Sequence, residues 1–529
     1  MMYFCLSLIP FFIYVISKSK KSLQMLQQNW YNLDQRYLKW ILSNKYNEFV
    51  GIDMFFVIFV VALFVESSVM FILFGVFYLV ILYLRYRSSN KEQVKLPLKV
   101  TARVKRLIIT ISLLYLVPVL TMLVSYDEHL LVYYYLLLAT LAYVNNFVIL
   151  TASVINIPVE KMVFNHFRNQ ATRKLKSMNS LDVIGITGSY GKTSSKNILH
   201  DILNVRYNVF KTPKNFNTPI GLIISVNNYL DKFNDLFIAE MGAFKIGEIQ
   251  ELCDLVHPKY GILTKVGTAH LESFGSQENI QIGKFELIES LPKDGIGILN
   301  ADDPLQVSYQ LKNDCKIVWI GIDNEDADVV ATDLKLSYKG TTFNVIFKGD
   351  DTKYEFTTRL LGKHNIYNIL QSIALGKELG LNIKELQAGV NRVNAIEHRL
   401  ELKKYGDINI IDDAYNSNPV GSKMALEVLG LMPGKKIVVT PGMIELGSEQ
   451  YELNMKFGEY IADVADEVIL VGKEQTKPIY DGLMHKDYKK KHIHVINDVK
   501  EAFPMMQTLK DENTYVLLEN DLPDIFNEK

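Results

Sequence analysis

The chain has 529 residues, of which 49% are hydrophobic and 22% are charged, and its formal net charge is −1. This length predicts three or four domains and excludes a single small module. The near-neutral total hides two unlike parts. Residues 1–160 hold 14 Lys and Arg against 8 Asp and Glu, a balance of +6, whereas the remainder holds 43 against 50, a balance of −7. Three widely spaced cysteines argue against a disulfide framework and against a cysteine zinc site.

Residues 1–160 are predicted to form transmembrane helices, because long apolar runs occupy residues 1–16, 52–84, 107–124 and 130–149. The second run is interrupted near Glu66, so it suits two short spans better than one helix of about 20 residues. The first run has no basic residue ahead of it, unlike a secretory signal. Together the runs predict an α-helical membrane domain of about five spans.

Basic residues between these runs predict the orientation. Residues 85–106 hold eight Lys and Arg against one Glu, whereas the short turns at Glu66 and Asp127 hold none. Cytoplasmic loops collect Lys and Arg, so five spans place everything after residue 151 in the cytoplasm. We therefore expect a multi-pass protein of the cell membrane with its remaining domains cytoplasmic. The alternative is that some runs are buried helices of a soluble protein.

Residues 161–180 are predicted to form a basic linker helix, because five Lys and Arg alternate with apolar residues there. Such a helix suits the anionic inner leaflet of a membrane. A solvated linker helix fits the same residues equally well.

Two α/β domains are predicted after the linker, over residues 181–396 and 397–529, where short apolar strands alternate with amphipathic helices. The second resembles a Rossmann-like unit, with strands expected near residues 408–411, 436–440, 467–471, 492–496 and 514–518.

A glycine-rich loop follows the first strand of the first α/β domain, with the sequence Gly188-Ser189-Tyr190-Gly191-Lys192-Thr193-Ser194. Glycines let backbone N–H groups and a helix N-terminus face a phosphate, Lys192 would reach the β and γ phosphates, and Thr193 would hold Mg²⁺. The strict P-loop pattern requires glycine where Ile186 stands, so a simple strand-to-helix turn is the alternative.

Further motifs follow in a fixed order, from Asn215 and Asn217 through Glu240, His270, Lys284, Asn365 and Asn368 to the segment DDAYNSNP that starts at Asp412. With the glycine-rich loop, these motifs resemble the Mur ligases of cell-wall peptide synthesis over residues 180–529. The segment DDAYNSNP is most similar to the D-alanyl-D-alanine-adding branch of that family, MurF.

The resemblance implies an ATP-dependent ligase in which a carboxylate takes the γ-phosphate of ATP and an amine attacks the acyl phosphate. ATP and two Mg²⁺ ions are the implied cofactors. Thr193 and Glu240 would bind the first ion, and His270 would help bind the second. Lys284 matches a lysine that CO₂ carbamylates in the family, which gives a further ligand. Oxygen ligands suit Mg²⁺, and paired ions stabilise an in-line displacement.

The resemblance also implies three sets of site residues, and closure of the last domain over ATP would complete the site. The catalytic set is Lys192, Lys284, His270 and Arg399. The nucleotide-binding set is Gly188, Ser189, Gly191, Lys192, Thr193, Ser194, Asn365, Asn368, Arg399 and Asp412. The set that faces the other substrates is Asn215, Asn217, Tyr415, Asn416 and Asn418. Simpler structural readings are a helix N-cap for Asn365 and Asn368, a turn before Pro419 for Tyr415, Asn416 and Asn418, and a surface position for Lys284.

The chain departs from the family at its beginning, where a soluble domain for the uridine diphosphate end of the precursor is usual. His398 also stands where a glycine usually precedes the arginine. We expect a cell-wall precursor and an amino acid or dipeptide as substrates, and no nucleic acid. The acceptor stays open between a soluble muramoyl peptide, a lipid-linked precursor and a non-murein acceptor such as an amino acid polymer. An ATP-driven transporter and a non-catalytic scaffold are the other classes.

Overall fold

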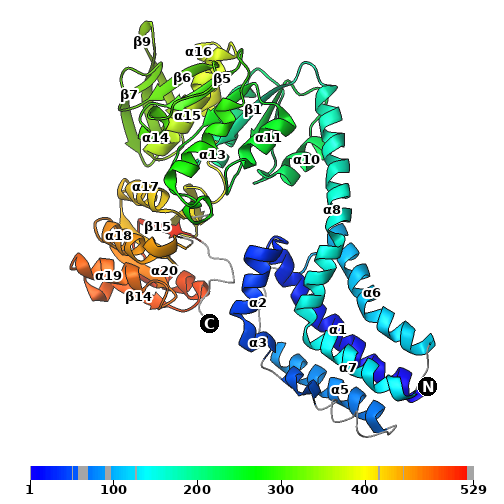
Figure 1. Cartoon of the computed structure of the whole chain (residues 1–529). Coiled ribbons are helices and arrows are strands. Elements are labelled where there is room, and N and C mark those ends of the chain that lie inside the picture. Colours follow the sequence, from blue (N-terminus) through cyan, green and yellow to red (C-terminus); the bar gives the residue numbers. More distant parts are fainter. Residues whose placement is uncertain are drawn as a thin grey trace. The chain divides into compact units, whose positions relative to one another are not determined.

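The computed structural model describes residues 2–49, 52–57, 69–89, 97–124, 128–414, 417–444 and 446–520. The chain forms two compact units, Met1–His166 and Phe167–Lys529, and each is described by itself (Figure 1).

The first unit is helical. α1 packs along α5, and α6 packs along α7. Its longer helices are α1 (Met2–Gln28), α5 (Val69–Ser89), α6 (Ala102–Val124), α7 (Glu128–Tyr143) and α8 (Asn145–Lys176), and α8 continues into the second unit. Short helical segments lie between α1 and α5: a π-helical turn (Leu33–Leu38), α2 (Lys39–Ser43), α3 (Lys45–Phe49) and a 3-10 turn (Ile52–Val57).

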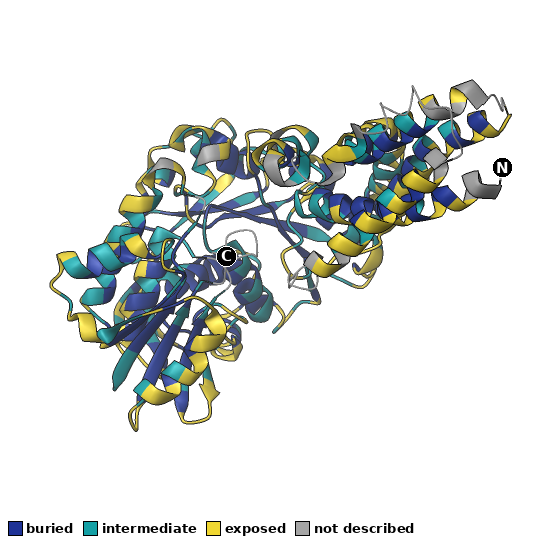
Figure 2. Cartoon of the chain, turned by 90° about the horizontal axis from the view of Figure 1, so that it is seen from below, coloured by how far each residue is buried: buried dark blue, intermediate teal, exposed yellow. Residues whose placement is uncertain are grey.

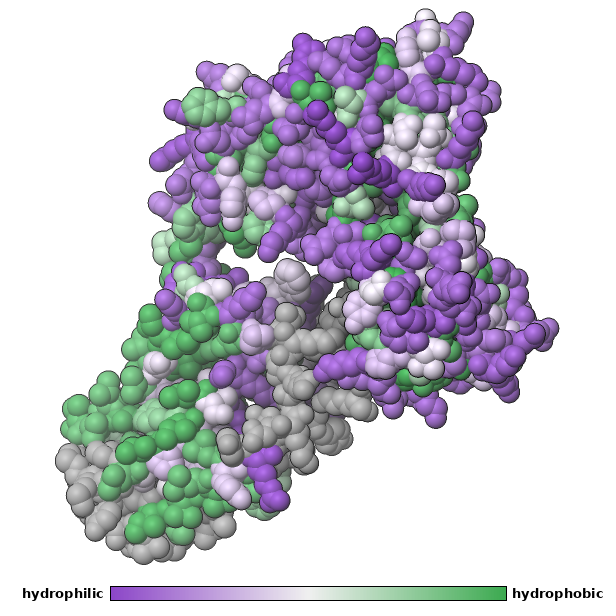
Figure 3. Space-filling model, turned by 180° about the vertical axis from the view of Figure 1, so that it is seen from behind, coloured by the Kyte–Doolittle hydropathy of each residue, from purple (hydrophilic) through white to green (hydrophobic). Residues whose placement is uncertain are grey.

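The helical unit is apolar outside as well as inside. On α6, Leu107, Ile111 and Tyr115 are buried, whereas Ile109 and Leu113 are exposed. A helix that is apolar on all sides is typical of a deeply buried helix or of a membrane span. Figure 3 shows hydrophobic residues over much of the visible face of this unit, whereas the visible face of the second unit is mainly hydrophilic.

The prediction of about five spans is not supported. Among the described residues, two helices, α6 and α8, are long and apolar enough to cross a membrane, and a shorter apolar helix covers Ile72–Arg85. The run over residues 130–149 is divided at Val144, between α7 and α8. The next two residues, Asn145 and Asn146, are buried and accept hydrogen bonds from Ser19 and Ser22 of α1. The predicted hairpin near Glu66 lies outside the described residues.

The second unit begins with a nine-stranded sheet of order β2-β3-β1-β4-β5-β6-β7-β8-β9, in which the last two pairings are antiparallel and the others parallel. Its strands are β1 (Asp182–Thr187), β2 (Val209–Lys211), β3 (Leu236–Glu240), β4 (Tyr260–Leu263), β5 (Ile296–Asn300), β6 (Lys316–Gly321), β7 (Val329–Ser337), β8 (Gly340–Phe347) and β9 (Asp350–Thr358). Its helices are α9 (Lys192–Leu203), α10 (Pro219–Asn228), α11 (Glu248–Val256), α12 (Leu271–Phe274), α13 (Gln277–Glu289), α14 (Pro304–Val307), α15 (Lys363–Glu378) and α16 (Ile383–Arg392).

A six-stranded sheet of order β10-β11-β15-β12-β13-β14 follows, and only its β10–β11 pairing is antiparallel. Its strands are β10 (Glu401–Tyr405), β11 (Ile408–Asp413), β12 (Lys435–Thr440), β13 (Glu467–Val471), β14 (Ile493–Ile496) and β15 (Thr514–Glu519). Its helices are α17 (Pro419–Gly430), α18 (Gln450–Ala462), α19 (Lys477–His485) and α20 (Ala502–Leu509), with 3-10 turns at Gly447–Glu449, Lys490–His492 and Val499–Glu501. Five of these strands lie where the sequence predicts them.

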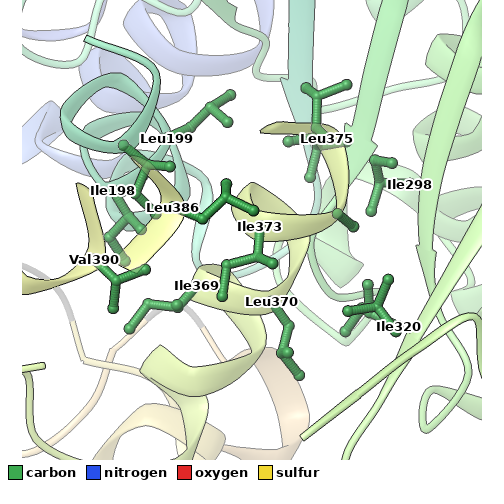
Figure 4. Close-up of a cluster of buried hydrophobic side chains, with 14 of the residues drawn as sticks. Ile198, Leu199, Ile298, Ile320, Ile369, Leu370, Ile373, Leu375, Leu386 and Val390 are labelled. Carbon is green, nitrogen blue, oxygen red and sulfur yellow. The ribbon is translucent and has the colours of Figure 1, made fainter. Parts of the chain in front are cut away.

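Helices cover the nine-stranded sheet, so its central strands are buried (Figure 2). On one face, α9, α15 and α16 pack through aliphatic side chains such as Ile198, Ile373 and Leu386 (Figure 4). On the other face α13 comes very close to the sheet, because a Cβ atom on Gly185 would lie 2.5 Å from a methyl carbon of Leu287. This close packing sets the position of α13.

Candidate active site

The glycine-rich loop joins β1 to α9 with two residues in the left-handed region. Gly188 has φ +147° and Gly191 has φ +84°. At Gly188 a Cβ atom would lie 2.1 Å from Oγ1 of Thr264, so both backbone conformation and space require glycine. Thr264 in turn donates to the carbonyl oxygens of Thr187 and Tyr190, which fixes the loop on β4.

Lys192 starts α9 and folds back over this loop. Its Nζ donates to the carbonyl oxygens of Gly188, at 2.6 Å, and Ser189, at 3.2 Å. Burial lowers the pKa of Lys192 to about 8; the charge of Arg399 adds to this shift and Glu240 opposes it. The cation therefore lies at the point where the loop and the N-terminus of α9 favour an anion.

Glu240 ends β3 and is 1% exposed. Its Oε1 accepts hydrogen bonds from the Thr193 hydroxyl, at 3.2 Å, and from the Asn217 amide, at 3.1 Å. Its Oε2 forms an ion pair with Lys196 Nζ at 2.9 Å. Thr193 and Glu240, which the resemblance assigns to one Mg²⁺ ion, are therefore direct neighbours, and their oxygen atoms are of the kind that Mg²⁺ prefers.

Lys196 is a site residue that the motifs did not reveal. It is 1% exposed, and besides Glu240 it contacts the carbonyl oxygen of Lys214. A buried lysine needs such partners, because an unpaired buried charge is costly. The available signal was its spacing, since a residue four positions after Lys192 shares its helix face.

Of the two asparagines near Lys214, only Asn217 reaches this cluster; its backbone also accepts a hydrogen bond from the N–H of Gly242. Asn215 is exposed. Ser189 donates to the carbonyl oxygen of Gly267, and Ser194 is buried in the first turn of α9.

Lys284 is buried on α13, with 1% of its surface exposed. Its Nζ donates to the carbonyl oxygen of Ala243 at 3.2 Å and lies 5.2 Å from the centre of the Phe274 ring. Burial, reinforced by the charge of Lys192, lowers the pKa of Lys284 to about 7. A substantial neutral fraction at pH 7 follows, and a neutral amine can react with an electrophile.

His270 precedes α12 with φ +63° and is exposed. Its ring packs edge-on against Phe244, with the ring centres 4.5 Å apart. Phe244 directly follows Ala243, the partner of Lys284, so His270 and Lys284 approach the same segment. Among the described residues, no group of three or more His, Cys, Asp and Glu side chains is arranged to hold a metal ion.

The start of α15 lies beside the glycine-rich loop. A Cβ atom on Gly191 would come within 3.2 Å of Oδ1 of Asn368. Asn365 is buried and donates to the carbonyl oxygen of Leu361. Neither side chain caps α15, whose N-cap is Gly362. Burial lowers the pKa of His364 to about 4, so this ring is neutral at pH 7.

The segment that enters the six-stranded sheet carries Arg399, and β11 carries Asp412. The charge of Arg399 acts on both Lys192 and Asp413. Oδ2 of Asp412 pairs with Nδ1 of His398 at 2.7 Å and with Nζ of Lys403 at 2.9 Å. Although burial opposes it, these contacts hold the pKa of Asp412 below its ordinary value.

The predicted amine-site residues are only partly described. Tyr415 and Asn416 lie outside the described residues. The Asn418 side chain accepts a hydrogen bond from the N–H of Gly421 at 2.9 Å, so it caps α17. Two further acids at this edge, Asp413 and Glu519, were not assigned from the sequence; the available signal was an acid at the end of each apolar strand.

Comparison with known proteins agrees with this geometry. Residues 186–376 match the Mur ligase middle domain, and residues 398–519 match the Mur ligase glutamate ligase domain. The chain is 35% identical over 296 residues to the UDP-N-acetylmuramoyl-tripeptide–D-alanyl-D-alanine ligase of Bacillus subtilis, covering 55% of this chain and 63% of that one. It is 32% identical over 295 residues to the Escherichia coli ligase of the same name, covering 55% and 65%. The chain thus spans less than two thirds of the length of these relatives.

Among solved structures, the MurF ligase of Thermotoga maritima in complex with ADP matches with a TM-score of 0.60 and 28% identity, over 68% of this chain and 80% of that chain. A MurF structure from Acinetobacter baumannii matches with a TM-score of 0.60 at 24% identity, over 68% and 77%, and shows the fold alone. These matches confirm the predicted α/β fold of the two domains.

Proposed function

We propose that this chain is an ATP-dependent, ADP-forming amide ligase. It matches the middle and C-terminal domains of the Mur ligase family. The reaction is the MurF-like addition of D-alanyl-D-alanine, or a similar amine, to a muramoyl peptide of peptidoglycan synthesis. The observation that carries this proposal is the cluster of Lys192, Thr193 and Glu240 around the glycine-rich loop.

The residues of this cluster divide the work of activating a carboxylate. The loop N–H groups and Lys192 hold the phosphates of ATP. Thr193 and Glu240 would hold a Mg²⁺ ion, which neutralises phosphate charge when it is bound. Asn217 and Lys196 keep Glu240 in place from its other sides. The acceptor carboxylate attacks the γ-phosphorus, ADP leaves, and the resulting acyl phosphate is attacked by the amine.

Lys284 and His270 are proposed to serve the acyl phosphate side of the site. A lowered pKa supports carbamylation of Lys284, because CO₂ reacts with the neutral amine and converts it into an anionic oxygen donor. An amine in this place has no oxygen to offer a metal, so a second Mg²⁺ site requires this modification. Arg399 and Asp412 would meet the nucleotide when the C-terminal domain closes and excludes water.

The helical unit favours a second candidate acceptor, one that is bound to the membrane. Its apolar outer surface and the two helices long enough to span a bilayer support membrane attachment, with the ligase domains on the cytoplasmic side. A membrane-attached ligase would meet a lipid-linked precursor, or a non-murein acceptor at the membrane, more readily than it would meet a soluble acceptor.

The experiment that separates these versions uses the purified full-length protein with ATP and D-alanyl-D-alanine. The acceptor is UDP-muramoyl tripeptide in one arm and its polyprenyl-linked form in the other, and amide and ADP are quantified together. Amide formation with either acceptor supports the ligase. A preference for the polyprenyl-linked form supports the membrane version, and a strong preference for the soluble form excludes it. Absence of amide in both arms contradicts the proposed substrates.

A further inference from the structure

A pair of carboxyl groups, one buried and one partly buried, lies at the carboxyl edge of the six-stranded sheet. Asp413 ends β11 and Glu519 ends β15, and the two residues are register partners on adjacent parallel strands. Register partners point their side chains to the same face of a sheet, so the two acids are neighbours. Ligands of open α/β sheets bind outside the carboxyl ends of the strands, which is where this pair lies.

Glu519 has an incomplete set of partners. It is 1% exposed, and its Oε1 accepts a hydrogen bond from the Ser417 hydroxyl at 2.6 Å. Its Oε2 has no hydrogen-bond partner among the described residues, although the atom is buried. A buried acceptor without a partner is costly, and its retention in a fold points to a ligand that supplies the donor.

Asp413 is held from the other side by its own neighbours. Its Oδ1 accepts the N–H of Leu400 at 3.2 Å, which ties it to the residue next to Arg399. Burial raises the pKa of Asp413, with Asp412 acting in the same direction and Arg399 against it. Burial also raises the pKa of Glu519, reinforced by Asp413 and opposed by Ser417. Two adjacent carboxyl groups repel each other when both are ionised, so a state in which one of them keeps its proton is favoured.

We infer that Asp413 and Glu519 together bind the ammonium group of the incoming amine and take up the proton it must lose before it attacks. This inference rests on the proposed ligase function and adds the residues that recognise the amine. An ammonium offers three N–H donors and one positive charge, which suit an acid pair that keeps one proton and carries one negative charge. An α-amino group has an ordinary pKa of about 8, so it is largely protonated at pH 7 and needs an acceptor.

The proton balance of the step is complete. The ammonium gives one proton to the carboxyl pair and becomes a neutral amine. Its nitrogen bonds to the acyl carbon of the acyl phosphate, the bond from that carbon to the phosphate oxygen breaks, and the second proton leaves with the phosphate. The pair then releases its proton to water as the product leaves.

The test measures binding and turnover of one amine on the full-length protein. D-alanyl-D-alanine and its N-acetylated form, which has no ammonium, are titrated by calorimetry into the wild type, Glu519→Gln and Asp413→Asn. We expect the wild type to bind the free dipeptide and not the acetylated one, and each variant to lose about tenfold or more in affinity. Glu512→Gln, an exposed acid before the other end of β15, is the matched control and should bind as the wild type does.

Turnover separates this inference from the ligase proposal. Hydroxylamine is uncharged at neutral pH and traps acyl phosphates, so hydroxamate formation should be equal in the wild type and Glu519→Gln. The KM for D-alanyl-D-alanine should rise in the variant while the KM for ATP stays the same. If the wild type does not bind the free dipeptide, or if both variants bind it normally, the inference is wrong. If dipeptide binding depends on the pair but no acceptor yields hydroxamate, the ligase proposal fails instead.

Discussion

The side chain of Lys192 would give the proposed phosphate site its charge, and its lowered pKa makes that charge sensitive to pH. Because the pKa is about 8, the amine is mostly protonated at pH 7 and loses its proton as pH rises through about 8. The affinity of the wild type for ATP should therefore fall as pH rises through this value. In Lys192→Met, affinity at pH 7 should be about tenfold or more weaker and should no longer change with pH.

Equilibrium binding of ATP at several pH values measures both effects. Lys339→Met, which removes an exposed lysine from the turn between β7 and β8, is the control and should keep the wild-type curve. A wild-type curve that is flat across this range would contradict the role given to Lys192.

The ion pair of Lys196 and Glu240 should contribute measurably to stability. Lys196→Met leaves the buried Glu240 without its cation, so the free energy of unfolding should fall by about 3–5 kcal/mol. The double variant Lys196→Met with Glu240→Gln removes both charges and should recover much of that loss.

Denaturant unfolding of both variants and of Glu240→Gln completes the cycle. Neither Lys196→Met nor the double variant should regain normal Mg²⁺-dependent turnover, because Glu240 is either misplaced or absent. Additive effects of the two substitutions on stability would show that the pair does not interact.

Helix α13 packs close to β1 because Gly185 has no side chain there. Gly185→Ala would put a methyl group 2.5 Å from Leu287, which pushes α13 and Lys284 away from the sheet. We expect a loss of about 1–3 kcal/mol in stability together with lower ligase activity. Gly430→Ala at the end of α17 meets only ordinary contact, at 3.8 Å, and is the matched control. Normal activity in Gly185→Ala would separate Lys284 from this packing.

Asp302 joins the loop after β6 to α15 and should make stability depend on pH. Burial would raise its pKa, but hydrogen bonds from the N–H groups of residues 322–324 and from Tyr367 lower it below the ordinary value. A lowered folded-state pKa stabilises the fold above the unfolded pKa of about 4, and this contribution is lost as pH falls through the folded value. Asp302→Asn should cost about 1–3 kcal/mol at pH 7 and flatten the acid limb of stability.

Unfolding curves from pH 7 down to acid conditions would check this prediction. Asp326→Asn, an exposed acid in the same region, should leave the wild-type pH dependence intact. An acid limb equally steep in Asp302→Asn would show that another group is responsible.

The sequence predicted the parallel elements better than the antiparallel ones. Five strands of the second sheet and the β1-loop-α9 unit were predictable, because buried parallel strands are continuous apolar runs. The antiparallel strands β7, β8, β9 and β10 were not identified; in the exposed part of β7 and in β10, charged and polar residues outnumber apolar ones. Lys196 and Glu519 were missed for a related reason, since only tertiary contacts distinguish a buried charge from a surface one.

In the whole molecule, the basic segments of the apolar helical unit and the acidic α/β unit nearly cancel, which gives the net charge of −1. Hydropathy located the apolar helices, but only two helices among the described residues are long and apolar enough to support the predicted spans. Hydropathy does not show where a helix turns or buries polar side chains. The break at Val144, beside the buried Asn145 and Asn146, is such a place.

The transfer of an oxygen atom from the acceptor to phosphate tests whether this chain joins a carboxylate to an amine through an acyl phosphate. The test uses an acceptor peptide whose reacting carboxylate carries oxygen-18 at both oxygen atoms, with ATP, D-alanyl-D-alanine and the full-length protein. Mass spectrometry then follows the label. Each amide formed should be accompanied by one ADP and one inorganic phosphate carrying an oxygen-18 atom. ADP released with unlabelled phosphate, at a rate independent of the amine, would contradict this prediction.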